Sequence, residues 1–205
     1  MQVKEFDLLK TIYEKNGFHL YLVGGTVRDL LLDIPLDDLD FVTDATPEEE
    51  KSFLPEANYT FAKFGSIRLT VNGKEIDITT LREEGEYQDH RHPSYIRFVT
   101  DLGKDYLRRD FTINALYLDK DYQVIDFCGG LSDLQNKIIR FVGDPTLRIQ
   151  EDPLRICRAE RFRDRLGFQI EENSQKAMEE NFPLLKKLNP AKIKEEIKKG
   201  WKEHD

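Results

Sequence analysis

Residues 21–45, YLVGGTVRDLLLDIPLDDLDFVTDA, constrain the fold more strongly than any other stretch of this sequence. The apolar run HLYLV, residues 19–23, is typical of a buried strand, and the pair Gly24-Gly25 then interrupts it. Four apolar residues follow at helical spacing and precede Pro35: Val27, Leu30, Leu31 and Ile34. The pattern therefore predicts a strand, a glycine turn and a helix that lies on the sheet.

A second strand is predicted for DDLDFVT, residues 37–43. Because side chains alternate along a strand, Leu39 and Phe41 would share one face, and Asp38 and Asp40 the other. Two carboxylates that project in the same direction repel each other, so this arrangement is unfavourable unless a cation joins them.

A β-hairpin is predicted around Asn72-Gly73, which lies between the extended segments 67–71 and 75–80. On its second arm Ile76 and Ile78 would face the core. Asp77 would then lie on the opposite side and supply a third carboxylate from a neighbouring strand.

The remaining segments before residue 144 predict a helix, a loop and several extended pieces. Residues 2–15 carry apolar residues at helical spacing and predict a leading helix. Residues 82–97 are charged, contain Gly and Pro, lack periodicity and are predicted to form a loop. Residues 111–118 and 123–127 bracket a turn, and residues 137–143 add one more extended piece.

Two aspartate or asparagine residues followed by proline mark helix starts near the end of the chain. The pairs are Asp152-Pro153 and Asn189-Pro190, in which the first residue caps the helix and proline takes its first position. We therefore predict an α/β fold, with a mixed sheet in residues 1–140 and a helical region in residues 141–205.

Composition limits the partners and the compartment. A chain of 205 residues with 39% hydrophobic residues buries one core, or one core and a small appendage. The net charge of -8 argues against a general nucleic-acid coat, and arginines gather only late in the sequence, so a nucleic acid would bind on a local face. With no apolar run near the roughly 20 residues of a membrane span, no signal-peptide pattern and only two cysteines, we expect a cytoplasmic protein without a membrane partner.

The acidic residues suggest metal chemistry. Magnesium prefers oxygen ligands, and two ions about 3.5 to 4 Å apart activate a hydroxyl and stabilise a phosphoryl leaving group. Asp38 and Asp40 are the candidate ligands, while backbone N–H groups at Gly24 and Gly25 would bind phosphates, with added charge from Arg28. The alternative is a solvated strand edge beside an ordinary turn.

Two further segments carry polar side chains at suggestive spacing. In LRRDFTINAL, residues 107–116, Arg108 and Arg109 would reach phosphates, and Asp110 and Asn114 would bind a ribose hydroxyl. The alternative for this segment is a helix cap with solvated arginines.

In EDPLRICRAERF, residues 151–162, one face of a helix would present Asp152, Arg155 and Arg158. A carboxylate that accepts from an exocyclic amino group and an arginine that donates to ring acceptors would together select cytosine or adenine. The alternative is an i, i+3 salt bridge worth a few tenths of a kcal/mol.

Taken in order, GGTVRD with LDDLD, RRDFTINAL and EDPLRICRAERF resemble the motifs of the class II tRNA nucleotidyltransferases, the CCA-adding enzymes and their poly(A) polymerase relatives. The resemblance implies a polymerase-β-like nucleotidyltransferase head in residues 1–140 and a helical neck with a nucleotide-selecting helix in residues 141–205. It also implies roles for individual residues. Asp38 and Asp40 would hold two Mg²⁺ ions, and Asp77 would take the place of the third carboxylate.

The same resemblance assigns the nucleotide contacts. Gly24, Gly25 and Arg28 would contact the triphosphate; Arg109 and Asp110 the phosphate and sugar; and Asp152 and Arg155, assisted by Arg158, the base. The implied reaction adds CMP and AMP from CTP and ATP to the 3' end of tRNA and releases pyrophosphate. Three alternatives stay open: a poly(A) polymerase, a relative that adds only A or CC, and a noncatalytic module that binds nucleotide or RNA.

Members of this family continue for some 200 residues beyond the neck, so we expect either a fragment or a minimal protein. The last predicted helix has an apolar stripe, which we expect to pack on its own domain: Leu188, Ile193, Ile197 and Trp201. The oligomeric state is left open.

Overall fold

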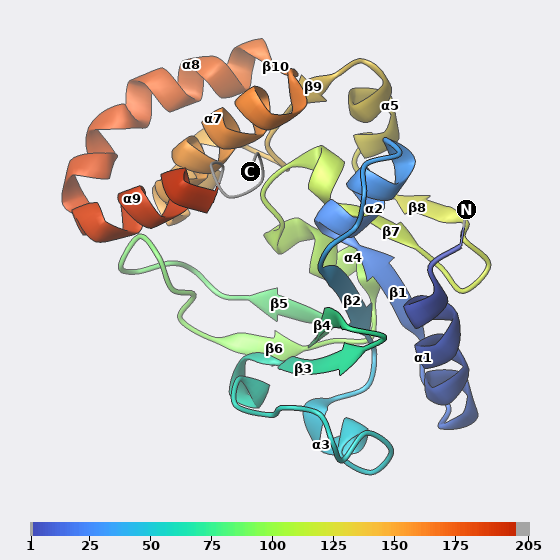
Figure 1. Cartoon of the computed structure of the whole chain (residues 1–205). Coiled ribbons are helices and arrows are strands. Elements are labelled where there is room, and N and C mark those ends of the chain that lie inside the picture. Colours follow the sequence, from blue (N-terminus) through green and yellow to red (C-terminus); the bar gives the residue numbers. More distant parts are fainter. Residues whose placement is uncertain (1, 200–205) are drawn as a thin grey trace. The chain divides into compact units, whose positions relative to one another are not determined.

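The predicted strand, helix and strand are present in the computed structural model, which describes residues 2–199 (Figure 1). They are β1 (Leu20–Val23), α2 (Gly24–Leu31) and β2 (Leu39–Thr43). The two glycines begin the helix rather than precede it, and β2 starts one residue after Asp38. The α/β prediction is therefore confirmed, with these shifts in the element ends.

Helix α2 ends at Leu31, before Pro35 would have to end it. Asp33 adopts a left-handed conformation with φ of 57°, and its N–H donates to the carbonyl of Leu30. The N–H of Ile34 donates to the carbonyl of Asp29, which completes a Schellman motif. The prediction that Ile34 belongs to the helix is therefore wrong, because the chain leaves the helix at Leu32.

The sheet of this region has six strands in the order β3-β4-β2-β1-β7-β8. Strands β2 and β4 pair in parallel, and every other neighbouring pair is antiparallel. The remaining strands are β3 (Ser66–Val71), β4 (Lys74–Thr80), β7 (Leu116–Leu118) and β8 (Val124–Asp126). The strands that carry the acidic residues, β2 and β4, are therefore direct neighbours inside the sheet.

The β3–β4 hairpin has the predicted turn. Val71 pairs with Lys74, so only Asn72 and Gly73 connect the strands, and both have positive φ values of 53° and 79°. This is the backbone of a type I′ turn, which Asn-Gly favours. The prediction is confirmed, and it leaves a single register for the hairpin.

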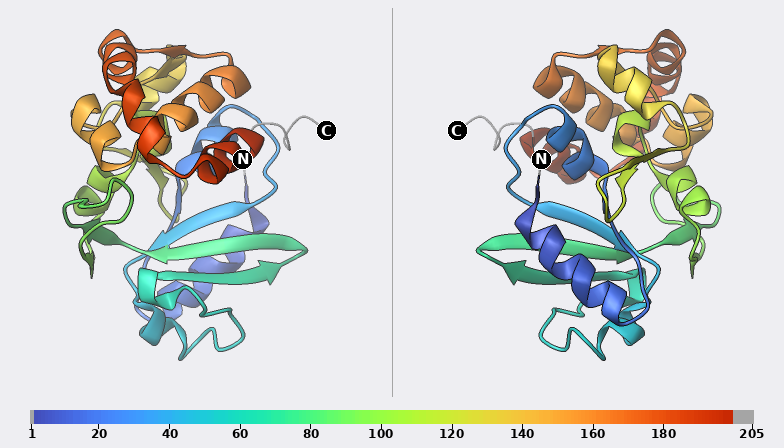
Figure 2. Two further views of the ribbon diagram at one scale, coloured as in Figure 1. Left: turned by 90° about the vertical axis from the view of Figure 1, so that its left-hand side faces the viewer. Right: turned by 90° about the vertical axis from the view of Figure 1, so that its right-hand side faces the viewer.

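Helix α1 (Lys4–Lys15) covers the apolar face of the sheet (Figure 2). Its Phe6 ring lies 5.5 Å from the Phe41 ring of β2 in an edge-to-face contact, and both side chains are buried. Ile76 and Ile78 of β4 are also fully buried, as predicted. Because side chains alternate, residues 40 and 77 face away from this layer.

The segment 82–97, predicted as a loop, is paired at both ends. Strands β5 (Arg82–Glu84) and β6 (Ile96–Phe98) form a two-stranded antiparallel sheet, and only residues 85–95 connect them. Backbone hydrogen bonds do not require apolar side chains, and the pair Glu83–Arg97 places opposite charges across the strands. The loop prediction is therefore wrong for the ends of the segment.

Short helices connect these strands: α3 (Pro47–Glu50), α4 (Leu102–Asp105), and the 3₁₀ turns η1 (Ala62–Phe64), η2 (Tyr106–Arg108) and η3 (Thr112–Asn114). Thr46 caps α3 through a reciprocal hydrogen-bond pair with Glu49. Both cysteines, Cys128 and Cys157, are free thiols. Within residues 2–199 no helix is long and apolar enough to cross a bilayer.

The chain forms two compact units. The first unit contains residues up to Glu84 with Ile96–Arg109 and Asn114–Phe127, and the second unit contains Gly85–Tyr95, Asp110–Ile113 and the residues from Cys128 onward. The predicted division at residues 140 and 141 stays a prediction.

The second unit is mainly helical. It contains α5 (Gly130–Gln135), α6 (Pro145–Glu151), α7 (Leu154–Leu166), α8 (Glu172–Asn181), η4 (Phe182–Lys187) and α9 (Pro190–Lys199). Strands β9 (Ile138–Ile139) and β10 (Gln169–Ile170) form a short parallel pair. Phe111 packs against Phe141 and Phe162 in its core.

In the second unit a helix also precedes Asp152, in addition to the one that Asp152-Pro153 predicts. Asp144 caps α6 by accepting from the N–H groups of Thr146 and Leu147, with Pro145 at the first position. Asp152 ends α6, and its side chain accepts from the N–H of Leu154, the first residue of α7.

Helix α9 begins as predicted, because the side chain of Asn189 accepts from the N–H of Ala191. The prediction for its apolar stripe is wrong at Ile197, which is 51% exposed. Glu196 is buried instead and accepts a hydrogen bond from Arg161. Trp201 lies outside the described residues.

Candidate active site

Asp40 on β2 lies in register with Asp77 on the parallel strand β4. Both residues alternate with buried apolar neighbours, so their side chains lie on the face of the sheet opposite Phe41. Asp38 is exposed and comes immediately before β2. The first unit thus brings together the three predicted carboxylates, named here the acid cluster: Asp38, Asp40 and Asp77.

The acid cluster resists ionisation at Asp40. This residue is accessible to solvent, but surrounding protein atoms partly desolvate its carboxylate. That desolvation, followed by the negative charges of Asp77 and Asp38, raises the pKa of Asp40 to about 6, against the opposing effect of Arg109 and Arg68. A cation beside Asp40 would relieve this repulsion.

Arg68 on β3, which was not predicted as a site residue, pairs with Asp77. Its Nε lies 2.7 Å from Oδ1 of Asp77 and its Nη2 lies 2.9 Å from Oδ2. Its Nη1 also contacts Glu75 at 2.8 Å. A signal for Arg68 exists in the sequence, because counting outward from the Asn72-Gly73 turn places it directly opposite Asp77.

The donor chemistry of the acid cluster fits a divalent cation. Carboxylate oxygens are the ligands that Mg²⁺ prefers, and both Asp38 and Asp40 are accessible to solvent. Arg68 already occupies part of the carboxylate of Asp77. No three His, Cys, Asp or Glu side chains in residues 2–199 already surround a single point as a metal cage would.

The glycine start of α2 lies beside residues of the RRDFTINAL segment. Gly24 has φ of +65°, and a Cβ atom there would lie 3.6 Å from the carbonyl oxygen of Asn114 and 3.8 Å from Nη1 of Arg109. The N–H of Asp40 donates to the hydroxyl of Thr26 at 2.9 Å, which ties α2 to the strand of the acid cluster. N–H groups at a helix start favour an anion.

Arg28 lies under this turn rather than on the surface. It is 2% exposed, its Nη1 donates to Oδ1 of Asn114 at 2.7 Å, and its Nε donates to Oδ1 of Asp29 at 2.7 Å. A Cβ atom on Gly25 would lie 3.3 Å from Nη2 of Arg28. Arg28 therefore supports the glycine turn, and a direct contact with a triphosphate stays a prediction.

Arg109 is held by two residues that were not predicted. Asp105 accepts from its Nε and Nη2, and the hydroxyl of Tyr117 accepts from its Nε. Burial opposes the charge on Asp105, but Arg109 and Arg108 outweigh it and lower the pKa of Asp105 below its ordinary value. Their sequence positions carry no pattern that would have identified them.

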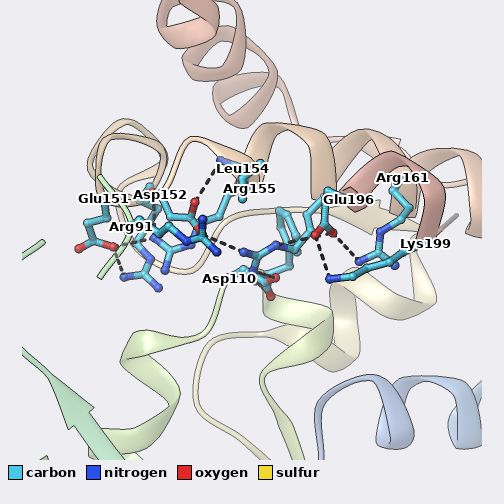
Figure 3. A network of polar contacts seen from close by, with 12 residues as sticks. Arg91, Asp110, Glu151, Asp152, Leu154, Arg155, Arg161, Glu196 and Lys199 are labelled. Atoms are coloured by element: carbon cyan, nitrogen blue, oxygen red, sulfur yellow. Dashed lines mark hydrogen bonds and ion pairs between the residues drawn. The ribbon is translucent and has the colours of Figure 1, made fainter. Parts of the chain in front are cut away.

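The base-selecting candidates lie in the second unit (Figure 3). Arg158 joins two aspartates: its Nη2 lies 2.8 Å from Oδ2 of Asp152 and its Nη1 lies 3.2 Å from Oδ2 of Asp110. Arg155 is held by Glu151, at 2.7 Å, and by the carbonyl of Arg148, at 2.6 Å. The second unit thus gathers the predicted Asp110, Asp152 and Arg158, and directs Arg155 to Glu151.

Comparisons with known proteins agree with this arrangement. Residues 20–140 match the family described as the Poly A polymerase head domain. The CCA-adding enzyme of Lactobacillus helveticus is 45% identical over 197 residues, which are 96% of this chain and 49% of that protein. The CCA-adding enzyme of Pediococcus pentosaceus is 43% identical over 199 residues, 96% of this chain and 50% of that protein. The chain spans about half the length of the curated relatives it matches.

Solved structures are similar over nearly the whole chain. The Bacillus stearothermophilus CCA-adding enzyme in complex with CTP matches with a TM-score of 0.88 and 34% identity, over 98% of this chain and 49% of that chain. A tRNA nucleotidyltransferase complexed with a primer tRNA and an incoming ATP analog matches with a TM-score of 0.74 and 34% identity, over 93% of this chain and 55% of that chain.

Proposed function

Because the chain belongs to the poly(A) polymerase head domain family, we propose that it is the catalytic and nucleotide-selecting part of a CCA-adding nucleotidyltransferase. The reaction joins the α-phosphate of CTP or ATP to the 3' hydroxyl of tRNA and releases pyrophosphate. The names of the relatives and the CTP and tRNA complexes of similar structures favour this function over a poly(A) polymerase.

The pairing of Asp40 with Asp77 beside the glycine start of α2 carries the proposal. A noncatalytic protein would gain nothing from carboxylates whose desolvation and mutual repulsion raise the pKa of Asp40. In phosphoryl transfer, by contrast, positioning and charge neutralisation supply most of the catalysis. The three carboxylates would hold the metal ions, and the helix start would hold the triphosphate.

Nucleotidyltransferases of this family generally use divalent metal ions. We assign two Mg²⁺ ions to Asp38 and Asp40, with Asp77 as the third carboxylate. When bound, such ions lower the pKa of the attacking hydroxyl and stabilise the leaving pyrophosphate. The N–H groups at Gly24 and Gly25 would bind the triphosphate, with Arg109 directed at the same turn.

Base selection is assigned to the second unit. The carboxylate of Asp152 accepts from the exocyclic amino group that cytosine and adenine share, and the guanidinium of Arg155 donates to a ring acceptor. Uracil and guanine present a carbonyl at the matching place, which would repel Asp152. Arg158 holds Asp152 in position through their 2.8 Å contact. The cytoplasmic location stays a prediction.

Incorporation by the purified 205-residue chain tests this function. The substrates are tRNA transcripts that end before, within and after CCA, each with CTP, ATP or both, and the products are sized at nucleotide resolution. We expect C and CC from CTP alone, CCA from both nucleotides, and no extension of the complete end. Long A tails on unrelated RNA would support a poly(A) polymerase, and nucleotide binding without extension would support a noncatalytic module.

A further inference from the structure

We propose that Tyr117 and Asp105 are positioning residues that lock the guanidinium of Arg109 beside the glycine start of α2, and that they thereby set the affinity for the nucleotide triphosphate. The inference rests on the proposed function for the identity of the ligand. The fixed geometry itself is a property of the first unit, to which all three residues belong.

The three side chains form a closed triangle of hydrogen bonds. The hydroxyl of Tyr117 donates to Oδ2 of Asp105 at 2.7 Å and accepts from Nε of Arg109 at 3.1 Å. Nη2 of Arg109 donates to the same Oδ2 at 2.9 Å. Tyr117 and Asp105 are both 0% exposed, so water does not compete for these bonds.

These hydrogen bonds determine which nitrogen of the Arg109 guanidinium points toward the glycine start of α2. Nε and Nη2 of Arg109 face Asp105, and Nη1 is the atom that lies 3.8 Å from the Cβ position of Gly24. The guanidinium carbon also lies 5.3 Å from the centre of the Tyr117 ring, which restricts the side chain further. Arginine otherwise loses considerable rotamer freedom on binding a ligand, so a fixed arginine binds an anion with a smaller entropic cost.

Asp105 can hold Arg109 without being paired with it alone, because Asp105 also binds other groups. Its Oδ1 accepts from Nε of Arg108 and from the N–H of Arg82, both at 3.0 Å. Two arginine side chains therefore share one buried carboxylate, so the charge of Asp105 is divided between Arg108 and Arg109. A single arginine paired with Asp105 would instead be neutral and would attract phosphate weakly.

The test uses Tyr117→Phe, which removes the hydroxyl and keeps the ring. The dissociation constant of a nonhydrolysable CTP analogue with Mg²⁺, measured by calorimetry, should rise by about five- to tenfold, in line with the loss of hydrogen bonds to charged partners. In steady-state assays KM for CTP should rise while kcat stays within about twofold, because the contact acts on the bound triphosphate in ground and transition states alike.

Tyr122→Phe is the matched control. The Tyr122 hydroxyl accepts from the N–H of Val3 at 2.9 Å and contacts Asp7, so its removal costs comparable hydrogen bonds in the same unit. It should alter thermal stability but leave nucleotide affinity unchanged. In an Arg109→Lys background, Tyr117→Phe should add no further loss of affinity, because the residue through which it acts is already changed.

Two affinity results overturn the inference: wild-type affinity in Tyr117→Phe, or an equal loss of affinity caused by Tyr117→Phe in the Arg109→Lys background. If Tyr117→Phe does not fold, a measurement on the wild-type chain still tests whether Arg109 is locked. The Nε–H proton of Arg109, assigned in NMR spectra with Arg109→Lys, should exchange slowly before nucleotide is added, and rapid exchange would refute a locked side chain. If the wild-type chain binds no CTP analogue, the proposed function fails and with it the role in affinity, and the exchange rate then decides only whether Arg109 is locked.

Discussion

Arg68 on β3 forms two parallel hydrogen bonds, of 2.7 and 2.9 Å, with the carboxylate of Asp77 on β4. Asp77 in turn lies beside Asp40, so one residue of the acid cluster already has a cationic partner within the protein. Arg68 and a divalent cation therefore compete for the same carboxylate. Both side chains are partly exposed, which allows the contact to open.

Removal of Arg68 should consequently strengthen metal binding. In Arg68→Met we expect Mn²⁺ to bind about two- to fivefold more tightly, the range of an exposed ion pair, as measured by the EPR signal of free Mn²⁺. The Asp77→Asn background is the control, because Arg68→Met should have no such effect once its partner is neutral. A gain of equal size in both backgrounds would indicate general charge repulsion and contradict direct competition.

Asp40→Asn should abolish nucleotide incorporation, by at least about a thousandfold, while the fold is retained. Loss of this charge also relieves the repulsion from Asp77 and Asp38, so the melting temperature should stay equal or rise. Asp37→Asn, a change at an exposed neighbour, is the matched control and should keep activity. Near-normal incorporation by Asp40→Asn would disprove the assignment of the acid cluster.

Glu50 should make the stability of the protein depend on pH. Its side chain is fully buried, accepts a hydrogen bond from Tyr13, and has an Oε2 atom without a hydrogen-bond partner. Burial raises the pKa of Glu50 from 4.5 to about 8, so the folded state binds the proton more tightly than the unfolded state. The stabilising effect is complete below pH 4.5 and is lost as the pH rises to about 8.

Glu50→Gln removes this titration and keeps the shape of the side chain. The free energy of unfolding of Glu50→Gln minus that of the wild type, from urea titrations, should increase between pH 5 and pH 8 by an amount on the order of a few kcal/mol. Ser52→Ala, at an exposed residue that carries no titratable group, should give a constant difference. A flat difference for Glu50→Gln would show that the buried carboxyl does not titrate in this range.

Asp152→Ala should relax base selection. Without the carboxylate that accepts from the exocyclic amino group, discrimination between CTP and UTP should fall by at least about tenfold in a competition assay. The change also releases Arg158, so total incorporation should decline. Asp164→Ala, at an exposed position of α7, the helix that follows Asp152, should preserve the CTP:UTP ratio. An unchanged ratio in Asp152→Ala would refute the role assigned to Asp152.

Alternation and turn chemistry were sufficient to predict the acid cluster. The Asn72-Gly73 turn leaves one register, and Ile76 and Ile78 fix the direction of Asp77. The contact of Tyr117 with Asp105 could not be predicted, because residues 12 positions apart without periodicity meet only through tertiary packing. The exposure of Ile197 shows a related limit: helical spacing says which residues share a face but not what covers it.

Because β2 pairs with β4, the distance between Asp40 and Asp77 depends on the apolar side chains on the opposite face of the sheet. A slip of one residue between these strands would turn Asp77 inward and push Ile76 and Ile78 into water, at a cost of several kcal/mol. Residues that never approach a nucleotide therefore hold the distance between the groups that do. Substitutions of Ile76 or Ile78 should therefore lower the rate of nucleotide incorporation at temperatures where the protein is still folded.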